Sequence, residues 1–375
     1  MKKLLILFLC CVFALSGCGT EMETQLPAQT IPLPVSTFTT EPNPEETTLY
    51  AVSVPAIKET YETEDGTALF SYTAQHMQLI LPNEDIADNI ILDFLNRVDA
   101  SSENADNVLS AARLDYDPEE MWLPYYYQII YSPMRIDPGV LSLFGSQSSY
   151  SGGMHGSISC MAANYDLTTG DVLTLGSIMH MNASKEDFIV RIIDKLNTLT
   201  AQYDLYDDFE EAVYARLSGD ENLYEDFYFT QTGLCFYFAP YEIAPYASGI
   251  IHVEIPYTEL PGLIYDGYFP AERECVEGSM RATDFMQTDM EQFQNMAEVT
   301  LVNGEEIMAV YPEGRVEDIR ITVAGDGFNR PEYIIFAAFE MSDENAVVLS
   351  LSKEDIAEMT ISYMTNGKIQ SFPMG

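Results

Sequence analysis

Short runs of β-branched and aromatic residues, separated by turn residues, recur along most of the chain and restrict its fold more than any other feature. They follow one another most regularly in the last hundred residues, where Gly, Asn, Asp and Pro separate them. Regular spacing of this kind is typical of short paired strands. We therefore predict a small β-rich domain over residues 290–375, with strands at Val299–Val302, Ile307–Tyr311, Ile319–Val323, Tyr333–Phe339, Val347–Leu351 and Met359–Tyr363.

Residues 49–268 combine strand patterns with helical ones. Ile86, Ile90, Phe94 and Val98 recur at helical spacing and predict a helix that ends near Ala100. Ser184 and Asp187 form a capping-box pattern at the start of a second helix. Strands are predicted at Lys58–Leu81, 122–150, Ile158–Tyr165, Val172–Leu175, Asp226–Thr230, Leu234–Phe238 and Ile250–Ile255. The predicted class is α+β: an antiparallel sheet with packed helices, followed by the smaller C-terminal β-rich domain.

The first residues have the layout of a lipoprotein signal peptide. Lys2 and Lys3 precede an apolar run from Leu4 to Leu15, and Leu15-Ser16-Gly17-Cys18 follows it. We predict that residues 1–17 are the signal peptide and that Cys18 carries the lipid, because two acyl chains anchor a protein stably. The expected location is the extracellular face of the cytoplasmic membrane. The alternative is an ordinary secreted protein with a chance cysteine.

Residues 18–48 follow the predicted lipid anchor. From position 19 onward they contain eight Thr, five Pro and five Glu, without Lys or Arg. A segment of this composition buries too little apolar surface to fold. We predict a stalk.

The chain is strongly acidic, with 59 Asp and Glu against 17 Lys and Arg and a formal charge of −42. This charge argues against binding nucleic acid or an anionic lipid surface, so the predicted membrane contact is through Cys18 alone. A cationic partner would be attracted. The alternative is that acidity keeps an exported protein soluble.

Beside Cys18, the predicted mature chain keeps Cys160, Cys235 and Cys275. One disulfide can form outside the cell, and Cys160 with Cys235 is the pair considered. Both also lie in strand-like runs, where cysteine often serves as a small buried hydrophobe.

Two separated stretches resemble the extracellular domain of RsiV-type anti-sigma factors. The first is Tyr150-Ser151-Gly152-Gly153-Met154-His155-Gly156 followed by Asn164–Gly170. The second is Phe227–Thr230, Phe236–Phe238 and Pro240–Gly249, ending in Ile255-Pro256-Tyr257. A similar module accompanies some peptidoglycan deacetylases. The resemblance covers roughly residues 50–265 and implies a binding module.

In RsiV proteins this domain captures lysozyme, and capture exposes the anti-sigma factor to proteolysis. The resemblance therefore implies lysozyme or another basic protein, or peptidoglycan, as a partner here. We find no sigma-binding segment and no transmembrane helix in the sequence. The signalling output of RsiV proteins is therefore not expected from this chain.

Gly152, Gly153 and His155 are the first candidate ligand contacts. Consecutive glycines permit positive φ and a close backbone approach, which could build a ligand loop. The same glycines could instead begin a strand at a crowded bend. His155 could donate to a ligand, although a lone histidine is more often packed or hydrogen-bonded within the fold.

Tyr241, Glu242 and Tyr246 are the second set of candidates. They lie in a loop with prolines at 240 and 245, and they offer rigid aromatic surface beside a carboxylate. A buried tyrosine corner that closes the sheet is the alternative.

Motifs for catalysis and metal binding are absent from the sequence. His76, His155, His180 and His252 have no metal-ligand spacing, and Cys160 near His155 lacks a residue to orient it. The carboxylates at 204, 207, 208, 210 and 211 fit a solvated helix start, since the calcium-loop pattern is missing. No catalytic residue, cofactor or metal is predicted.

The predicted function is that of a cell-surface lipoprotein that binds an extracellular or cell-envelope ligand, either a lysozyme-like cationic protein or a peptidoglycan-related molecule. Two alternatives stay open. One is an accessory or enzymatic role in peptidoglycan modification, and the other is a structural role in the envelope.

Overall fold

The computed structural model describes residues 49–219, 226–271, 273, 275–285, 298–302, 306–325, 332–351 and 356–374. The chain divides into two units, Met1–Glu46 and Thr47–Gly375, and the second is compact. The predicted signal peptide, Cys18 and the predicted stalk lie outside the described residues.

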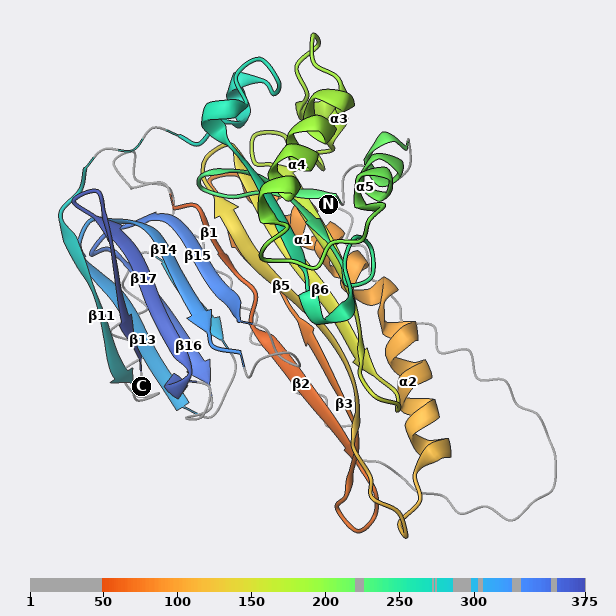
Figure 1. Ribbon diagram of the computed structural model, residues 1–375. Coiled ribbons are helices and arrows are strands. Elements are labelled where there is room, and N and C mark those ends of the chain that lie inside the picture. Colours follow the sequence, from red (N-terminus) through yellow and green to blue (C-terminus); the bar gives the residue numbers. More distant parts are fainter. Residues whose placement is uncertain are drawn as a thin grey trace, which may run out of the picture. The chain divides into compact units, whose positions relative to one another are not determined.

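A five-stranded sheet forms the first part of the compact unit. Its order is β2-β3-β5-β6-β7, and only β3 and β5 pair in parallel. Two helices, α1 and α2, run along this sheet (Figure 1) and share its apolar core. The bounds are β2 Ala56–Glu62, β3 Ala68–Gln75, β5 Tyr125–Ile136, β6 Val140–Tyr150, β7 Ser157–Asp166, α1 Glu84–Ala100 and α2 Ser102–Asp115.

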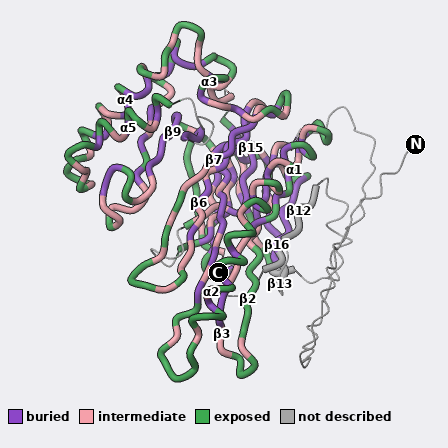
Figure 2. The backbone as a smooth tube through the Cα atoms, turned by 90° about the vertical axis from the view of Figure 1, so that its right-hand side faces the viewer, coloured by how far each residue is buried: buried purple, intermediate pink, exposed green. Residues whose placement is uncertain are grey.

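The helix predicted from the periodicity is confirmed as α1. Asn83 caps it, because its side chain accepts hydrogen bonds from the N–H groups of Asp85 and Ile86. Ile90 and Phe94 are fully buried on its inner side. Both α1 and α2 alternate buried and exposed positions (Figure 2), as expected of helices that cover one face of a sheet.

A second core lies under three helices and a three-stranded sheet of order β10-β9-β8. Every residue of β9 is buried. The predicted capping box opens α4: Ser184 donates its backbone N–H and its hydroxyl to the Asp187 carboxylate, each at 2.8 Å. The bounds are α3 Leu175–Ile178, α4 Lys185–Leu199, α5 Phe209–Ser218, β8 Phe227–Phe229, β9 Gly233–Phe238 and β10 Ile251–Pro256.

One feature of the predicted hairpin near residue 170 differs from expectation. β7 confirms the first strand, but the return is a single bridge between Tyr165 and Val172. Leu175 already begins α3, because Thr174 and Ser177 form a capping box there.

Two further sheets form the β-rich C-terminal part. One has the order β18-β17-β14-β15-β1-β4 and the other β11-β13-β16-β12, and side chains from both fill one core. The predicted runs correspond to six of their strands. The bounds are β1 Ala51–Ser53, β4 Gln78–Ile80, β11 Gly278–Phe285, β12 Glu298–Val302, β13 Glu306–Gly314, β14 Val316–Val323, β15 Tyr333–Met341, β16 Asn345–Leu351, β17 Met359–Thr365 and β18 Lys368–Pro373.

Strands β1 and β4 come from the beginning of the chain but pair within the C-terminal part. Ala51 pairs with Ala338 of β15 on one side and with Ile80 of β4 on the other. The predicted boundary between residues 268 and 290 is therefore bridged by backbone hydrogen bonds, and both predicted domains contribute to one sheet.

Arg135 of β5 forms a buried ion pair and also connects the first sheet to the segment after β10. The Arg135 guanidinium contacts the Asp137 carboxylate at 2.6 Å, with side chains 0% and 2% exposed. Arg135 also donates to the Tyr257 hydroxyl and the Tyr268 carbonyl oxygen, each at 2.7 Å. These bonds compensate the buried charge and fix the two 3₁₀ turns, Tyr257–Glu259 and Asp266–Tyr268, against β5.

Candidate functional site

The loop between β6 and β7 contains the first predicted contacts. Gly152 and Gly153 have φ values of +92° and +93°, which side chains of L-residues rarely adopt. A Cβ atom on Gly152 would also lie 2.7 Å from the Tyr125 hydroxyl oxygen. The Gly153 carbonyl oxygen accepts a hydrogen bond from Tyr150 at 3.1 Å. The glycines thus build a tight turn, and this turn carries His155 on the surface.

The loop between β9 and β10 contains the second set. The N–H of Tyr241 donates to the Ala244 carbonyl oxygen at 3.0 Å, and Ile243 and Ala244 are buried beneath the loop. Tyr241 has a φ of +72°, a left-handed conformation that costs a non-glycine residue roughly 1–2 kcal/mol. Its side chain is 56% exposed. The backbone therefore holds a large aromatic ring in solvent at an energetic cost.

The two loops meet. The imidazole of His155 stacks on the Tyr246 ring, with centroids 4.2 Å apart and an interplanar angle of 21°. The Tyr241 hydroxyl and His155 Nε2 are 3.3 Å apart, within hydrogen-bonding distance. Tyr241 and Tyr246 lie 5.6 Å apart. We call His155, Tyr241 and Tyr246 the aromatic cluster. On one surface, the cluster presents aromatic ring faces, a hydroxyl and an imidazole that a ligand could contact.

Glu242 faces away from this cluster, into an ion-pair network. It accepts a hydrogen bond from the Ala239 N–H at 2.8 Å and pairs with Arg216 of α5. Arg216 also contacts Asp226 at 3.1 Å and lies over the rings of Tyr237 and Phe238. Burial raises the pKa of the Glu242 carboxyl and of Asp226, and Arg216 partly opposes both shifts. Glu242 therefore holds the loop onto α5.

The sequence prediction missed Arg216. The signal that the sequence offers for Arg216 is composition. Basic residues are few in this chain and acidic residues are many, so an acidic partner is expected for each arginine. Its partners, however, lie ten and twenty-six residues away. Short-range helical spacing does not reveal such pairs.

Cys160, Cys235 and Cys275 are free thiols. Cys160 and Cys235 lie in the same small apolar cluster, around Tyr228 and Tyr237. Burial raises the pKa of both thiols to about 12. A thiol held protonated is a poor nucleophile, so the surroundings of Cys160 disfavour covalent catalysis.

In the described part of the chain, no three His, Cys, Asp or Glu side chains are grouped so as to hold a metal ion. No helix among the described residues is both long and apolar enough to cross a bilayer.

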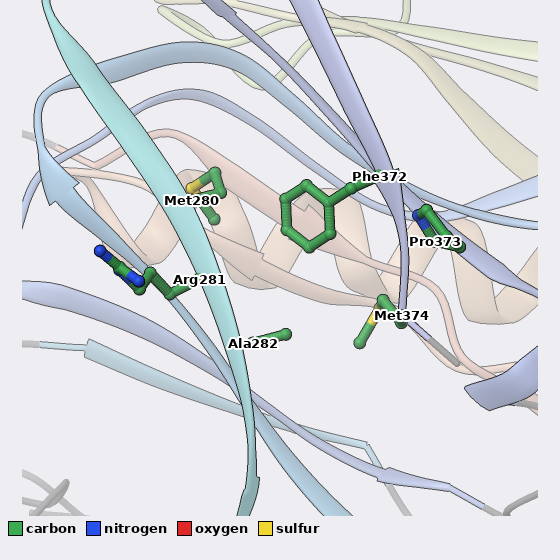
Figure 3. A pocket seen from close by; sticks show the side chains of 6 residues that line it. All are labelled: Met280, Arg281, Ala282, Phe372, Pro373 and Met374. Carbon is green, nitrogen blue, oxygen red and sulfur yellow. The ribbon is translucent and has the colours of Figure 1, made fainter.

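A surface pocket of about 310 Å³ lies between β11 and β18. None of the predicted site residues lines it. Figure 3 shows Phe372 pointing toward β11, whereas the guanidinium of Arg281 points away from the pocket and pairs with Glu313 at 2.7 Å. The other lining residues are Met280, Ala282, Pro373 and Met374. The pocket is an opening at the edge of the C-terminal core.

Comparisons with known proteins identify one segment. Residues 178–258 match the family described as "Protein of unknown function (DUF3298)". A search of curated proteins gave no match. The match runs from the end of α3 through β10, so it contains Tyr241, Glu242 and Tyr246 and leaves the β6–β7 loop outside.

Two solved structures resemble the chain. A DUF3298 family member from Bacteroides fragilis NCTC 9343 has 17% identity and a TM-score of 0.42, with 58% of this chain and 94% of that chain covered. A DUF3298 family protein from Pseudomonas aeruginosa PAO1 has 17% identity and a TM-score of 0.43, with 59% and 97% covered. The family match by itself assigns residues 178–258, and not the whole chain, to DUF3298.

Proposed function

We propose that this protein is a lipid-anchored binding protein displayed on the outer face of the membrane, and that the aromatic cluster contacts its ligand. The observation that carries the proposal is that two loops meet, each of which was predicted separately from the sequence to contact a ligand. His155 comes from one loop, and Tyr241 and Tyr246 come from the other. A surface built by two distant loops on rigid sheets is a common arrangement for binding.

The geometry of the cluster supports binding through aromatic faces. Stacking on Tyr246 and the contact with Tyr241 restrain His155, so little side-chain entropy is lost when a ligand covers the rings. Tyrosine is enriched at protein interfaces because it combines a large apolar face with a hydroxyl. The rings also suit stacking with sugars and with cationic side chains.

The ligand we propose is a cationic protein of the lysozyme type or a peptidoglycan fragment. The acidic charge of −42 favours the first by attraction. The resemblance to the RsiV-type extracellular domain supports the same two classes. Attachment through Cys18 would display the cluster outside the membrane.

Calorimetric titration of the unit Thr47–Gly375 with hen lysozyme and with muropeptides tests the proposal. We expect saturable binding at about 0.15 M salt that His155→Ala with Tyr241→Ser weakens about tenfold or more. The matched control is Tyr265→Ser, which removes another partly exposed tyrosine. Binding that vanishes at high salt and ignores both variants would show charge attraction alone and contradict the proposal. Turnover of muropeptides would favour an enzyme instead.

A further inference from the structure

The segment between α2 and β5 holds large apolar side chains out in solvent. Leu114, at the end of α2, is 85% exposed, and Met121 and Leu123 are 92% and 58% exposed. We call residues Leu114–Pro124 the apolar ledge. Single exposed apolar residues are common on protein surfaces, whereas here three of them fall within one short segment.

The ledge is held firmly, so its outward side chains have a defined position. Trp122 donates from its indole Nε1 to the Ala68 carbonyl oxygen at 3.0 Å. Its ring stacks on Tyr125 at 4.8 Å and meets the Tyr116 ring edge-on at 5.4 Å. Trp122 therefore fastens the centre of the ledge to the first sheet, between the exposed Met121 and Leu123.

Four carboxylates lie between Leu114 and Met121 in the sequence. Asp115, Asp117, Glu119 and Glu120 are all exposed, and the ledge contains no Lys or Arg. Asp115 accepts from the Tyr125 hydroxyl at 2.9 Å, and Asp117 accepts from the Glu119 N–H at 2.9 Å. Arg113 directly precedes the ledge. The surface thus combines exposed Leu and Met with a local excess of negative charge.

We propose that the apolar ledge is a second contact surface, separate from the aromatic cluster, and that it binds a polypeptide with lysine or arginine beside apolar side chains. The charge of the carboxylates determines which kinds of partner can cover the apolar surface. Anionic lipid headgroups would be repelled, and so would a second copy of this acidic chain. A basic amphipathic segment would satisfy both the apolar and the charged groups.

Fluorescence anisotropy tests this inference on Thr47–Gly375, the compact unit. The probe is a synthetic amphipathic helix of Leu and Lys, and a second peptide with Ser in place of Leu measures attraction by charge alone. We expect the Leu peptide to bind more tightly. Met121→Ser with Leu123→Ser should weaken that binding about tenfold or more. Leu92→Ser, on α1 and also 58% exposed, is the matched control and should have no effect.

A charge test complements it. Glu119→Gln with Glu120→Gln should weaken binding and reduce its salt dependence, whereas Asp204→Asn with Glu211→Gln should change neither. Equal affinity of the two peptides, or no effect of the ledge variants, would overturn the inference. So would ledge-dependent binding to phosphatidylcholine vesicles or ledge-dependent dimerisation in sedimentation. Loss of lysozyme or muropeptide binding in the His155 and Tyr241 variants is a separate result that concerns the aromatic cluster.

Discussion

The imidazole of His155 lies flat against the ring of Tyr246, with centroids 4.2 Å apart, although the two residues belong to loops of different sheets. Stacking of this kind contributes about 0.5–1.5 kcal/mol beyond the burial of the rings. The stacking therefore orders side chains at the surface that are not part of the hydrophobic core.

Tyr241→Gly separates the conformational cost of the loop from the role of the ring. Glycine adopts the positive φ without strain, which stabilises the folded state, but it also raises the conformational entropy of the unfolded chain. Because these effects oppose each other, the free energy of unfolding should change by less than about 1 kcal/mol. Lysozyme or muropeptide binding should nevertheless fall, because the ring is gone. Urea denaturation and calorimetry measure the two effects. A loss of stability of several kcal/mol would mean that the ring supports the fold.

Glu242→Gln should change the pH dependence of stability. Burial raises the folded-state pKa of Glu242 above its ordinary value. The stabilising contribution of such a carboxyl is complete below its ordinary pKa and is lost as the pH rises through the folded-state pKa. The free energy of unfolding of the wild type, minus that of the variant, should therefore fall across this window. Asp204→Asn is the control, and a difference that rises with pH would contradict the assignment.

The thiols should differ in reactivity. Burial raises the pKa of Cys160, which is half-buried, and of Cys235, which is fully buried, to about 12, so at about pH 8 both thiols stay protonated. Cys275 is exposed. In the native unit, Ellman's reagent should modify Cys275 rapidly and the other two only after denaturation. Rapid modification that persists in Cys275→Ser would contradict this description.

Arg135→Met should destabilise the protein by about 3–5 kcal/mol, because Asp137 is left charged and buried without its partner. Arg135→Met with Asp137→Asn should recover part of this loss, since Asn still accepts from the N–H groups of Gly139 and Val140. Urea midpoints measure both variants. Equal midpoints for wild type and Arg135→Met would show that the pair contributes nothing.

Cys18→Ser tests the proposed anchor, which lies outside the described residues. The wild type should partition with membranes and incorporate labelled palmitate, whereas the variant should do neither. Equal membrane association of both proteins would contradict lipidation at Cys18.

The sequence predicts the helices and strands of this protein better than it predicts which strands pair with one another. Helix α1 follows from its periodicity because one stripe must be buried, and six strands of the C-terminal part follow from runs between turn residues. The short strand β1 carries no such signal. Its pairing with β15 depends on the whole sheet being assembled. Strands β11 and β18 were missed because charged and small residues interrupt their apolar pattern.

The candidate site was predictable as two loops and not as one surface. Glycine pairs predict a tight turn, and Gly152 with Gly153 forms one. Whether His155 reaches Tyr246 depends on how the sheets pack, which local patterns do not encode. The composition of the loop alone predicts Glu242 as a ligand contact. In the structure its carboxylate instead binds Arg216 and the Ala239 N–H.

Titration of Thr47–Gly375 with hen lysozyme and with muropeptides, repeated with His155→Ala and Tyr241→Ser together, measures whether the aromatic cluster contacts the ligand. We expect saturable binding to at least one ligand at about 0.15 M salt, weakened about tenfold or more in the double variant and unchanged in Tyr265→Ser. Equal affinity of the wild type and the double variant for every ligand that binds would contradict it.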